Sequence, residues 1–193
     1  MKDIRLFGFW LLAFETMGHY CVYRTSSAEG LRLALVGGSF IWVGLLIGIS
    51  FTESWVKFKS TILERQVALD VGKLVFDALN TLELAIAISM LTLLHRFQPF
   101  QEKLWGIPLL MAFILGFQAF YLTPRLELRA LFIVAEELSK KKHATRADEK
   151  TFKAYKVATT LKKMPPTWMH HLYVILEVLK IGLLLKYTEL ISL

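Results

Sequence analysis

Four apolar segments dominate this chain, and each is long enough to form one helix across a lipid bilayer. They lie near residues 31–55, 68–95, 104–123 and 168–188. The hydrocarbon core of a bilayer is about 30 Å thick, and an α-helix crosses it in roughly 20 residues. The sequence therefore predicts an all-α fold, a polytopic membrane helix bundle with four core transmembrane helices.

The composition supports lipid as the surrounding solvent. Of the 193 residues, 55% are hydrophobic, whereas apolar residues make up about 45–50% of soluble domains. The single cysteine, Cys21, excludes an internal disulfide and a multi-cysteine metal centre. We expect one integral membrane domain over residues 1–193. It consists of an N-terminal helix, three transmembrane helices, a helical loop and a last transmembrane helix, over residues 1–30, 31–123, 124–166 and 167–193.

A fifth apolar segment, residues 4–23, contains Glu15 and His19. Helical projection places its apolar side chains on one face and these two residues on another. We favour a fifth spanning helix. A helix that lies flat in the membrane interface is the alternative.

Basic residues set the expected orientation. Eleven Lys and Arg against five Asp and Glu lie between Arg125 and Lys163, and this excess is nearly all of the net charge of +7. Loops rich in Lys and Arg remain in the cytoplasm, so loop 124–166 is expected inside and the C-terminus outside. The expected location is the bacterial inner membrane, with anionic lipid at the basic loop. No nucleic-acid recognition motif is present, so nucleic acid is not an expected partner.

The basic loop itself has helical periodicity. Its apolar residues predict two amphipathic helices, near 126–142 and 147–163, with a break between 141 and 145. Pro165 and Pro166 are expected to end the second helix, because proline lacks an amide donor and restricts the residue before it.

A polar stripe runs along the second predicted span. Its five members fall within an arc of roughly 140° on one helix face. Charge inside a bilayer costs roughly 2.5–3.5 kcal/mol per residue on insertion scales, so the stripe must face the interior of the bundle. The members are Asp70, Lys73, Asp77, Asn80 and Glu83.

The last span carries a second polar face, made of Tyr173, Glu177 and Lys180. Counting about 1.5 Å per residue from the loop side places Lys180 near the depth of Glu83. A Glu83–Lys180 pair is therefore expected, and Lys73 is within reach of Glu177. We expect the two helices to adjoin.

Two interpretations of these polar residues stay open at this stage. They form either a structural seam, in which Lys73 pairs with Asp70 and Asp77, or a path for an ion, proton or ligand. The path is suggested by the excess of acids over bases in the spanning stripe.

Small residues and tryptophans predict further roles in the first core span. Gly37, Gly44 and Gly48 lie there, and the GxxxG spacing of the last two predicts a close helix contact, inside the bundle or in a dimer. Trp42 and Trp55 are expected to anchor the ends of the span at the membrane interface.

Motifs of enzymes are missing from the chain. There is no Walker loop, GxGxxG, GxSxG or HExxH. No HxxxH or ExxH pair indicates a metal or haem site, so neither cofactor nor metal is expected.

Short motifs extend over roughly residues 33–185. They are Trp42-Val43-Gly44 with Phe58, Gly72-Lys73-Leu74-Val75, Leu79-Asn80-Thr81-Leu82-Glu83, Tyr121-Leu122-Thr123-Pro124-Arg125-Leu126 with Arg129-Ala130, and His170-His171-Leu172-Tyr173 ahead of Glu177. In these motifs the chain resembles bacterial membrane proteins of unknown function related to eukaryotic transmembrane protein 205. The resemblance implies a four-helix membrane core and no catalytic residue. That family looks distantly like copper-resistance membrane proteins, but the Met or His clusters of a copper path are missing here.

Together these features predict a non-enzymatic integral membrane protein. The leading hypothesis is that its buried polar seam binds or passes a small ion or solute. The alternative is an accessory or scaffold subunit that docks a membrane partner, or a second copy of itself, through the basic loop and the glycine face.

Overall fold

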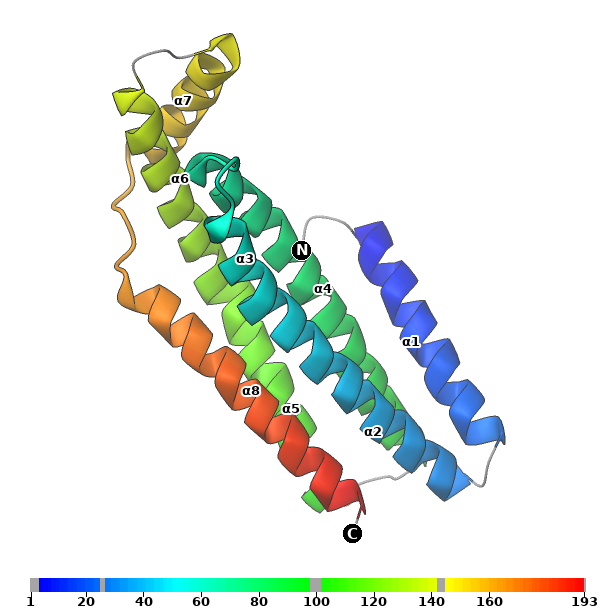
Figure 1. The fold of residues 1–193 in the computed structure, drawn as a ribbon. Helices are drawn as coiled ribbons and strands as arrows, with labels where there is room; N and C mark the ends of the chain where they lie inside the picture. The colour runs from blue at the N-terminus through cyan, green and yellow to red at the C-terminus, as the bar shows by residue number, and fades with distance from the viewer. Residues whose placement is uncertain (1–3, 25–26, 98–101, 142–144, 193) are drawn as a thin grey trace.

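The computed structural model describes residues 4–24, 27–97, 102–141 and 145–192, and the regular structure of these residues is entirely helical. The prediction of an all-α fold is confirmed. The described chain forms six helical rods (Figure 1). Two of these rods each consist of two α-helices that are joined by a π-helical segment. The elements are α1 (Ile4–Arg24), α2 (Ser27–Leu45), η1 (Leu46–Glu53), α3 (Ser54–Lys59), α4 (Arg65–Phe97), α5 (Glu102–Phe117), η2 (Gln118–Leu122), α6 (Thr123–Lys140), α7 (Arg146–Thr159) and α8 (Trp168–Ser192).

Three helices within the described ranges are long and apolar enough to cross a membrane: Ala28–Lys59, Arg65–His95 and Leu104–Lys140. They contain the first three predicted core spans. The fourth predicted span is helical as well, since α8 runs for 25 residues. It carries Glu177, Lys180 and Lys186 along its length.

One boundary of the sequence prediction is wrong. Residues 104–123 and 126–142 were expected as a span and a separate loop helix, but α5, η2 and α6 continue one another without a break up to Lys140. Pro124 does not interrupt this rod because it lies in the first turn of α6, where a missing amide donor is tolerated. The first half of the predicted loop is therefore an extension of the third span.

The second loop helix is shorter than predicted. α7 ends at Thr159, before Pro165 and Pro166 are reached, so the prolines do not end it. The break between the two helices was predicted over residues 141–145: Lys141 and Thr145 lie outside both helices as predicted, and residues 142–144 lie outside the described residues. α6 and α7 pack against each other as a hairpin at one end of the bundle (Figure 1).

The start of α7 is defined by a capping box. Thr145 Oγ1 accepts a hydrogen bond from the Asp148 amide at 3.2 Å, and the Asp148 carboxylate accepts one from the Thr145 amide at 2.9 Å. The Lys141 ammonium lies 3.2 Å from the same carboxylate and 3.1 Å from Glu64, which ties α7 to the segment before α4. The Thr145 amide, followed by Lys141, lowers the pKa of the Asp148 carboxyl below its ordinary value of 3.8.

Replacing Thr145 by Ala is expected to speed amide hydrogen exchange throughout α7, because the cap then lacks its side-chain acceptor. In the wild type, the stabilisation by Asp148 should be fully present above pH 3.8 and lost as the pH falls through the lowered pKa. Hydrogen exchange read by mass spectrometry checks both effects. Unchanged α7 exchange in T145A would contradict this account of the cap.

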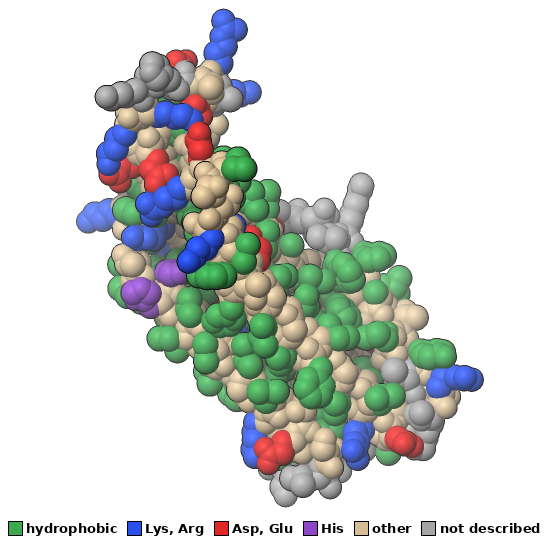
Figure 2. Space-filling view, in the orientation of Figure 1, with side chains coloured by type: hydrophobic (Ala, Val, Ile, Leu, Met, Phe, Trp, Pro, Cys, Tyr) green, Lys and Arg blue, Asp and Glu red, His purple; other side chains and the backbone are tan. Residues whose placement is uncertain are grey.

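The surface of the molecule separates apolar from charged side chains. Hydrophobic side chains cover the flank of the bundle, while Lys, Arg, Asp and Glu gather at its two ends (Figure 2). Large apolar residues such as Phe113 and Phe120 are 73% and 78% exposed. Soluble monomers rarely expose apolar surface on this scale. Together with the three candidate spans, this surface indicates a multi-pass membrane protein.

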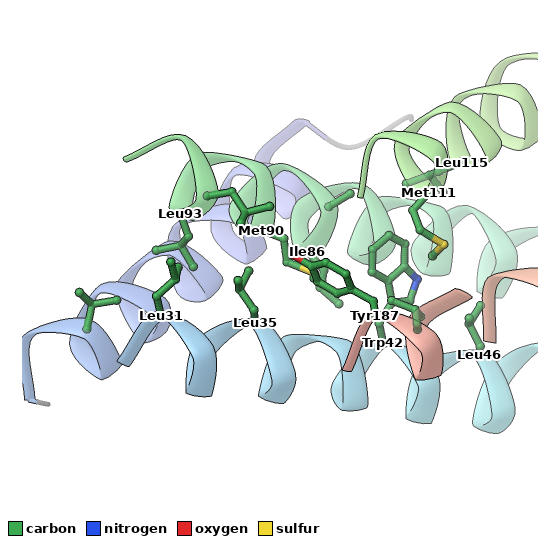
Figure 3. Packing of buried hydrophobic residues seen from close by; sticks show 14 residues of the cluster. Leu31, Leu35, Trp42, Leu46, Ile86, Met90, Leu93, Met111, Leu115 and Tyr187 are labelled. Carbon is green, nitrogen blue, oxygen red and sulfur yellow. The ribbon is translucent and has the colours of Figure 1, made fainter. Parts of the chain in front are cut away.

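The core lies between α2, α4, α5 and α8, whose buried apolar side chains meet in one cluster (Figure 3). α1 packs along α2 and α4. Gly18 lies at this contact, where an added Cβ would be 2.5 Å from Leu93 Cδ1, so a larger residue would force the Leu93 side chain to shift. The larger buried members of the cluster include Leu35, Trp42, Leu46, Ile86, Leu94, Met111, Leu115, Leu184 and Tyr187.

Candidate functional site

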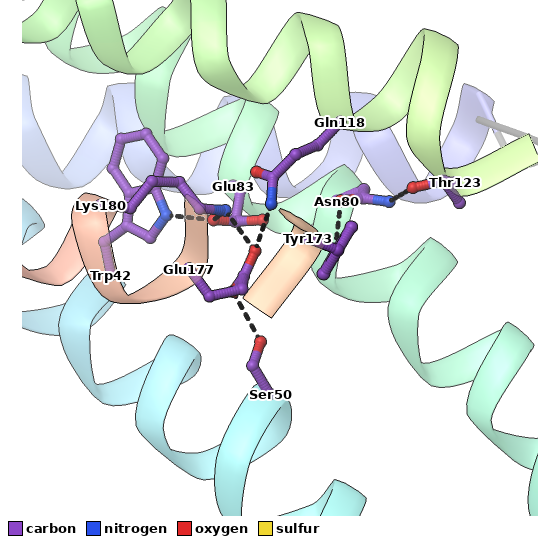
Figure 4. A network of polar contacts seen from close by, with 9 residues as sticks. All are labelled: Trp42, Ser50, Asn80, Glu83, Gln118, Thr123, Tyr173, Glu177 and Lys180. Atoms are coloured by element: carbon purple, nitrogen blue, oxygen red, sulfur yellow. Dashed lines mark hydrogen bonds and ion pairs between the residues drawn. The ribbon is translucent and has the colours of Figure 1, made fainter. Parts of the chain in front are cut away.

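Three charged side chains meet in the interior of the bundle (Figure 4). Lys180 of α8 forms ion pairs with Glu83 of α4 and with Glu177 one turn earlier in α8, the latter at 2.8 Å. Lys180 and Glu83 are fully buried, and Glu177 is 1% exposed. The predicted Glu83–Lys180 pair is confirmed. Depth along the two helices was sufficient to predict it.

Further donors surround the two carboxylates. Trp42 Nε1 of α2 donates to Glu83 Oε1 at 2.7 Å. Ser50 Oγ donates to Glu177 Oε2 at 2.7 Å, and Gln118 Nε2 donates to Glu177 Oε1 at 2.8 Å. Side chains from α2, η1, α4, η2 and α8 therefore converge on one polar cluster, shown in Figure 4.

Both π-helical turns supply residues to this cluster. Ser50 lies in η1 and Gln118 in η2. A π-helical turn contains one more residue than an α-helical turn, and such turns occur frequently at functional sites. Sequence reasoning did not identify Gln118 as a site residue. Its signal was a single uncharged amide within an otherwise apolar predicted span.

The cluster has more acceptors and negative groups than donors and positive groups. Glu83 and Glu177 share one ammonium group, that of Lys180. Within the described part of the chain, Glu83 Oε2 and Gln118 Oε1 are buried without a hydrogen-bond partner. A buried polar atom without a partner costs about 1–3 kcal/mol, and more when the group is charged.

A second polar branch lies next to the charged cluster. Asn80 Nδ2 donates to Thr123 Oγ1 of α6 at 3.1 Å, and the Tyr173 hydroxyl donates to Asn80 Oδ1 at 3.4 Å. The Tyr173 ring meets Phe76 edge-on, with ring centroids 5.6 Å apart. The predicted face of Tyr173, Glu177 and Lys180 is thus buried as a whole.

The predicted stripe on α4 divides into two parts. Asn80 and Glu83 face the interior, whereas Asp70 and Lys73 form a 2.7 Å ion pair at the exposed end of the helix. The Tyr155 hydroxyl of α7 donates to Asp70 at 3.2 Å. Asp77 is half-buried between the two parts.

The expected contact between Lys73 and Glu177 is wrong. Lys73 Nζ pairs with Asp70 and donates to Tyr155 of α7 instead. Helix depth alone could not reveal the contact with α7, whose Tyr155 meets both Lys73 and Asp70.

The role predicted for Trp42 is also wrong. This side chain is 1% exposed and donates to Glu83, so it does not anchor the membrane interface, whereas Trp55 is 62% exposed. Both tryptophans satisfy the same sequence rule, and only the packing of α2 against α4 distinguishes them.

The glycine face does not pack inside the bundle. A Cβ added at Gly37, Gly44 or Gly48 would meet no described atom within 4 Å, and the last two glycines are exposed. A dimer contact through these glycines stays a prediction. Close approach occurs at Gly72 of α4, where an added Cβ would lie 2.7 Å from the ammonium nitrogen of Lys57.

A cavity of about 600 Å³ lies between η1, α3, α4, α6 and the start of α8. Ser50, Thr123, Tyr173 and Glu177 line it, so it reaches the polar cluster from one side. At the described positions, no group of three or more His, Cys, Asp or Glu side chains is placed to hold a metal ion.

No protein-family model, curated protein or solved structure matches this chain. The resemblance to the proteins related to transmembrane protein 205 therefore stays a prediction.

Proposed function

We propose that this chain is a non-enzymatic membrane protein that binds a proton at the Glu83–Glu177–Lys180 cluster and passes it on through the adjoining cavity. A single observation carries the proposal: two buried carboxylates face one ammonium group, and Glu83 Oε2 has no hydrogen-bond partner among the described residues.

The proposal treats α8 as a fourth span and α1 as a fifth. The charges of α8 do not oppose this, because Glu177 and Lys180 are buried while Ile175, Val178 and Leu179 are exposed. At about 1.5 Å per residue the helix is about 37 Å long, more than the roughly 30 Å of hydrocarbon. α1 lies alongside α2 and α4, which supports a spanning helix over a flat one.

Charge balance explains why a proton would bind. A buried carboxylate without a balancing cation is costly, so such a group takes up a proton. The groups that face Glu83 are Lys180 and Glu177 of α8 and the Trp42 donor of α2. A proton on Glu83 would leave one carboxylate with one ammonium group, and it would convert Oε2 from an unpaired acceptor into a donor.

Access to the cluster is from the side of the cavity. Glu177 and Ser50 line its inner end, so Glu177 can exchange a proton with water there. Lys180 bridges Glu177 and Glu83, which places the two carboxylates within one connected network. Trp42 and Gln118 hold the carboxylates in position.

Replacing Glu83 by Gln tests the proposal. The amide oxygen can still accept from Trp42 and Lys180, and the surplus negative charge is gone, so we expect E83Q to fold with a thermal stability equal to or above that of the wild type. We expect proton uptake into proteoliposomes to fall to the rate of protein-free vesicles. The infrared band of the buried carboxylic acid should be lost from the difference spectrum between low and high pH, while the bands of the exposed acids remain.

Asp70→Asn provides the matched control. It removes one acid from the same helix, but Asp70 lies at the exposed end, paired with Lys73. D70N should keep both the infrared band and the proton uptake of the wild type. Equal uptake by wild type and E83Q, or by wild-type and protein-free vesicles, would contradict the proposal.

A further inference from the structure

The cavity next to the polar cluster has a positively charged lining that proton binding does not use. Four basic side chains line it, against the two acids Glu127 and Glu177. The partners of three of these bases, Glu53, Asp70 and Glu137, do not line the cavity. The basic residues are Lys57, Arg65, Lys73 and Arg129.

The ammonium group of Lys57 is held at this cavity by its surroundings. Glu53 pairs with it at 3.0 Å, and the Phe76 ring lies 5.5 Å from it. Gly72 leaves the space that the ammonium group occupies. A cation held in this way loses little conformational freedom when an anion binds, which favours binding.

The other walls of the cavity are apolar. Side chains from η1, α3, α6 and α8 form them, so the cavity joins a basic region to a hydrocarbon-like one. These side chains are Phe51, Trp55, Phe58, Leu126, Ile133 and Val174. A ligand that fits both regions has an anionic head and an apolar tail.

We propose that this cavity binds an anionic phospholipid, with its phosphate among the four basic side chains and an acyl chain along the apolar wall. Basic pockets between transmembrane helices are known to take anionic lipid headgroups. The volume of about 600 Å³ falls within the range of roughly 300–1,000 Å³ that is usual for ligand sites. The cavity lies beside candidate spans, where lipid is the most concentrated amphiphile.

This inference concerns the same cavity as the proton-binding proposal but is carried by different observations. It rests on the basic and apolar lining of the cavity, whereas proton binding rests on Glu83 and its missing partner. E83Q should therefore bind lipid as the wild type does, and loss of lipid binding should not require loss of the infrared carboxylic-acid band.

The double variant Arg65→Gln and Lys73→Gln tests the basic part of the site. Purified protein in detergent is titrated with phosphatidylglycerol, and bound lipid is counted by native mass spectrometry. Each Lys or Arg near an anionic headgroup changes binding roughly fivefold, so we expect the affinity to fall roughly 25-fold. The matched control, Lys150→Gln with Lys153→Gln, removes the same charge from exposed positions on α7 and should bind as the wild type does.

A third variant, Ala130→Phe, tests the apolar part. Ala130 is a half-buried lining residue, so the larger side chain fills the cavity without a change of charge. It should also reduce phosphatidylglycerol binding while the thermal unfolding temperature stays within a few degrees of the wild type.

Three results would overturn the proposal. The first is an equal loss of affinity in the Arg65–Lys73 variant and in the α7 control, which would indicate general surface electrostatics. The second is equal binding of zwitterionic phosphatidylcholine. The third is displacement of the lipid by inorganic phosphate at matched concentration, which would indicate a soluble anion as the occupant.

Discussion

Replacing Lys180 by Met is expected to destabilise the protein strongly, by about 3–5 kcal/mol, because it leaves Glu83 and Glu177 buried without their shared cation. Met fills most of the space of the Lys side chain, so the loss would come from charge and not from a cavity. The apparent free energy of unfolding in detergent, followed by circular dichroism, measures this effect.

Two comparisons separate charge from packing in this experiment. In the double variant E83Q/K180M only one buried carboxylate is left without its cation, so we expect a smaller loss than in K180M alone. Such non-additivity is usual within one ion-pair network. Lys186→Met is the matched control in the same helix, because Lys186 is exposed and pairs with Glu189 at the surface. Surface pairs contribute about 0–1 kcal/mol, so K186M should change little. Equal losses in K180M and K186M would contradict this account.

Replacing Trp42 by Ala is the second change with a large expected effect. Trp42 lies in the core cluster and donates to Glu83. Truncation of a buried Trp to Ala costs about 3–5 kcal/mol through lost packing and the cavity that remains. The free energy of unfolding of W42A in detergent measures it.

The variant Trp42→Phe separates the contribution of the hydrogen bond to stability from that of the bulky side chain. Phe keeps an aromatic ring in the core but removes the donor to Glu83, so a loss of about 1–3 kcal/mol is expected. Trp55→Ala is the matched control, because that residue is exposed, and exposed positions usually change stability by about 0.5 kcal/mol or less. If W55A lost as much stability as W42A, the result would contradict a special role of Trp42 in the core.

The sequence was sufficient to predict the interior pair between α4 and α8. Glu83 and Lys180 lie within apolar segments whose length sets their depth, and charges at that depth turn inward because lipid does not solvate them. The same reasoning predicted that Tyr173 and Glu177 share the buried face. These predictions succeeded because depth and helical periodicity are both properties of the linear chain.

Other parts of the site depend on contacts that the linear chain does not define. The π-helical turns that contain Ser50 and Gln118 carry no hydropathy or periodicity signal in the sequence, yet both residues donate to Glu177. From the sequence, Lys73 could pair with several acids. In the structure it pairs with Asp70 and donates to Tyr155 of α7. The continuity of α5 through α6 was missed because the basic residues that follow the third span were assigned to a separate loop.

By itself the sequence determined the helical class, the three candidate spans and the inward direction of the buried charges, because hydropathy and helical period act locally along the chain. Only the tertiary structure decided that two carboxylates share one lysine, that Trp42 completes the cluster, and that a cavity with basic and apolar walls adjoins it. These features depend on which helices pack together. Packing is selected by the whole set of side-chain contacts and not by any one segment.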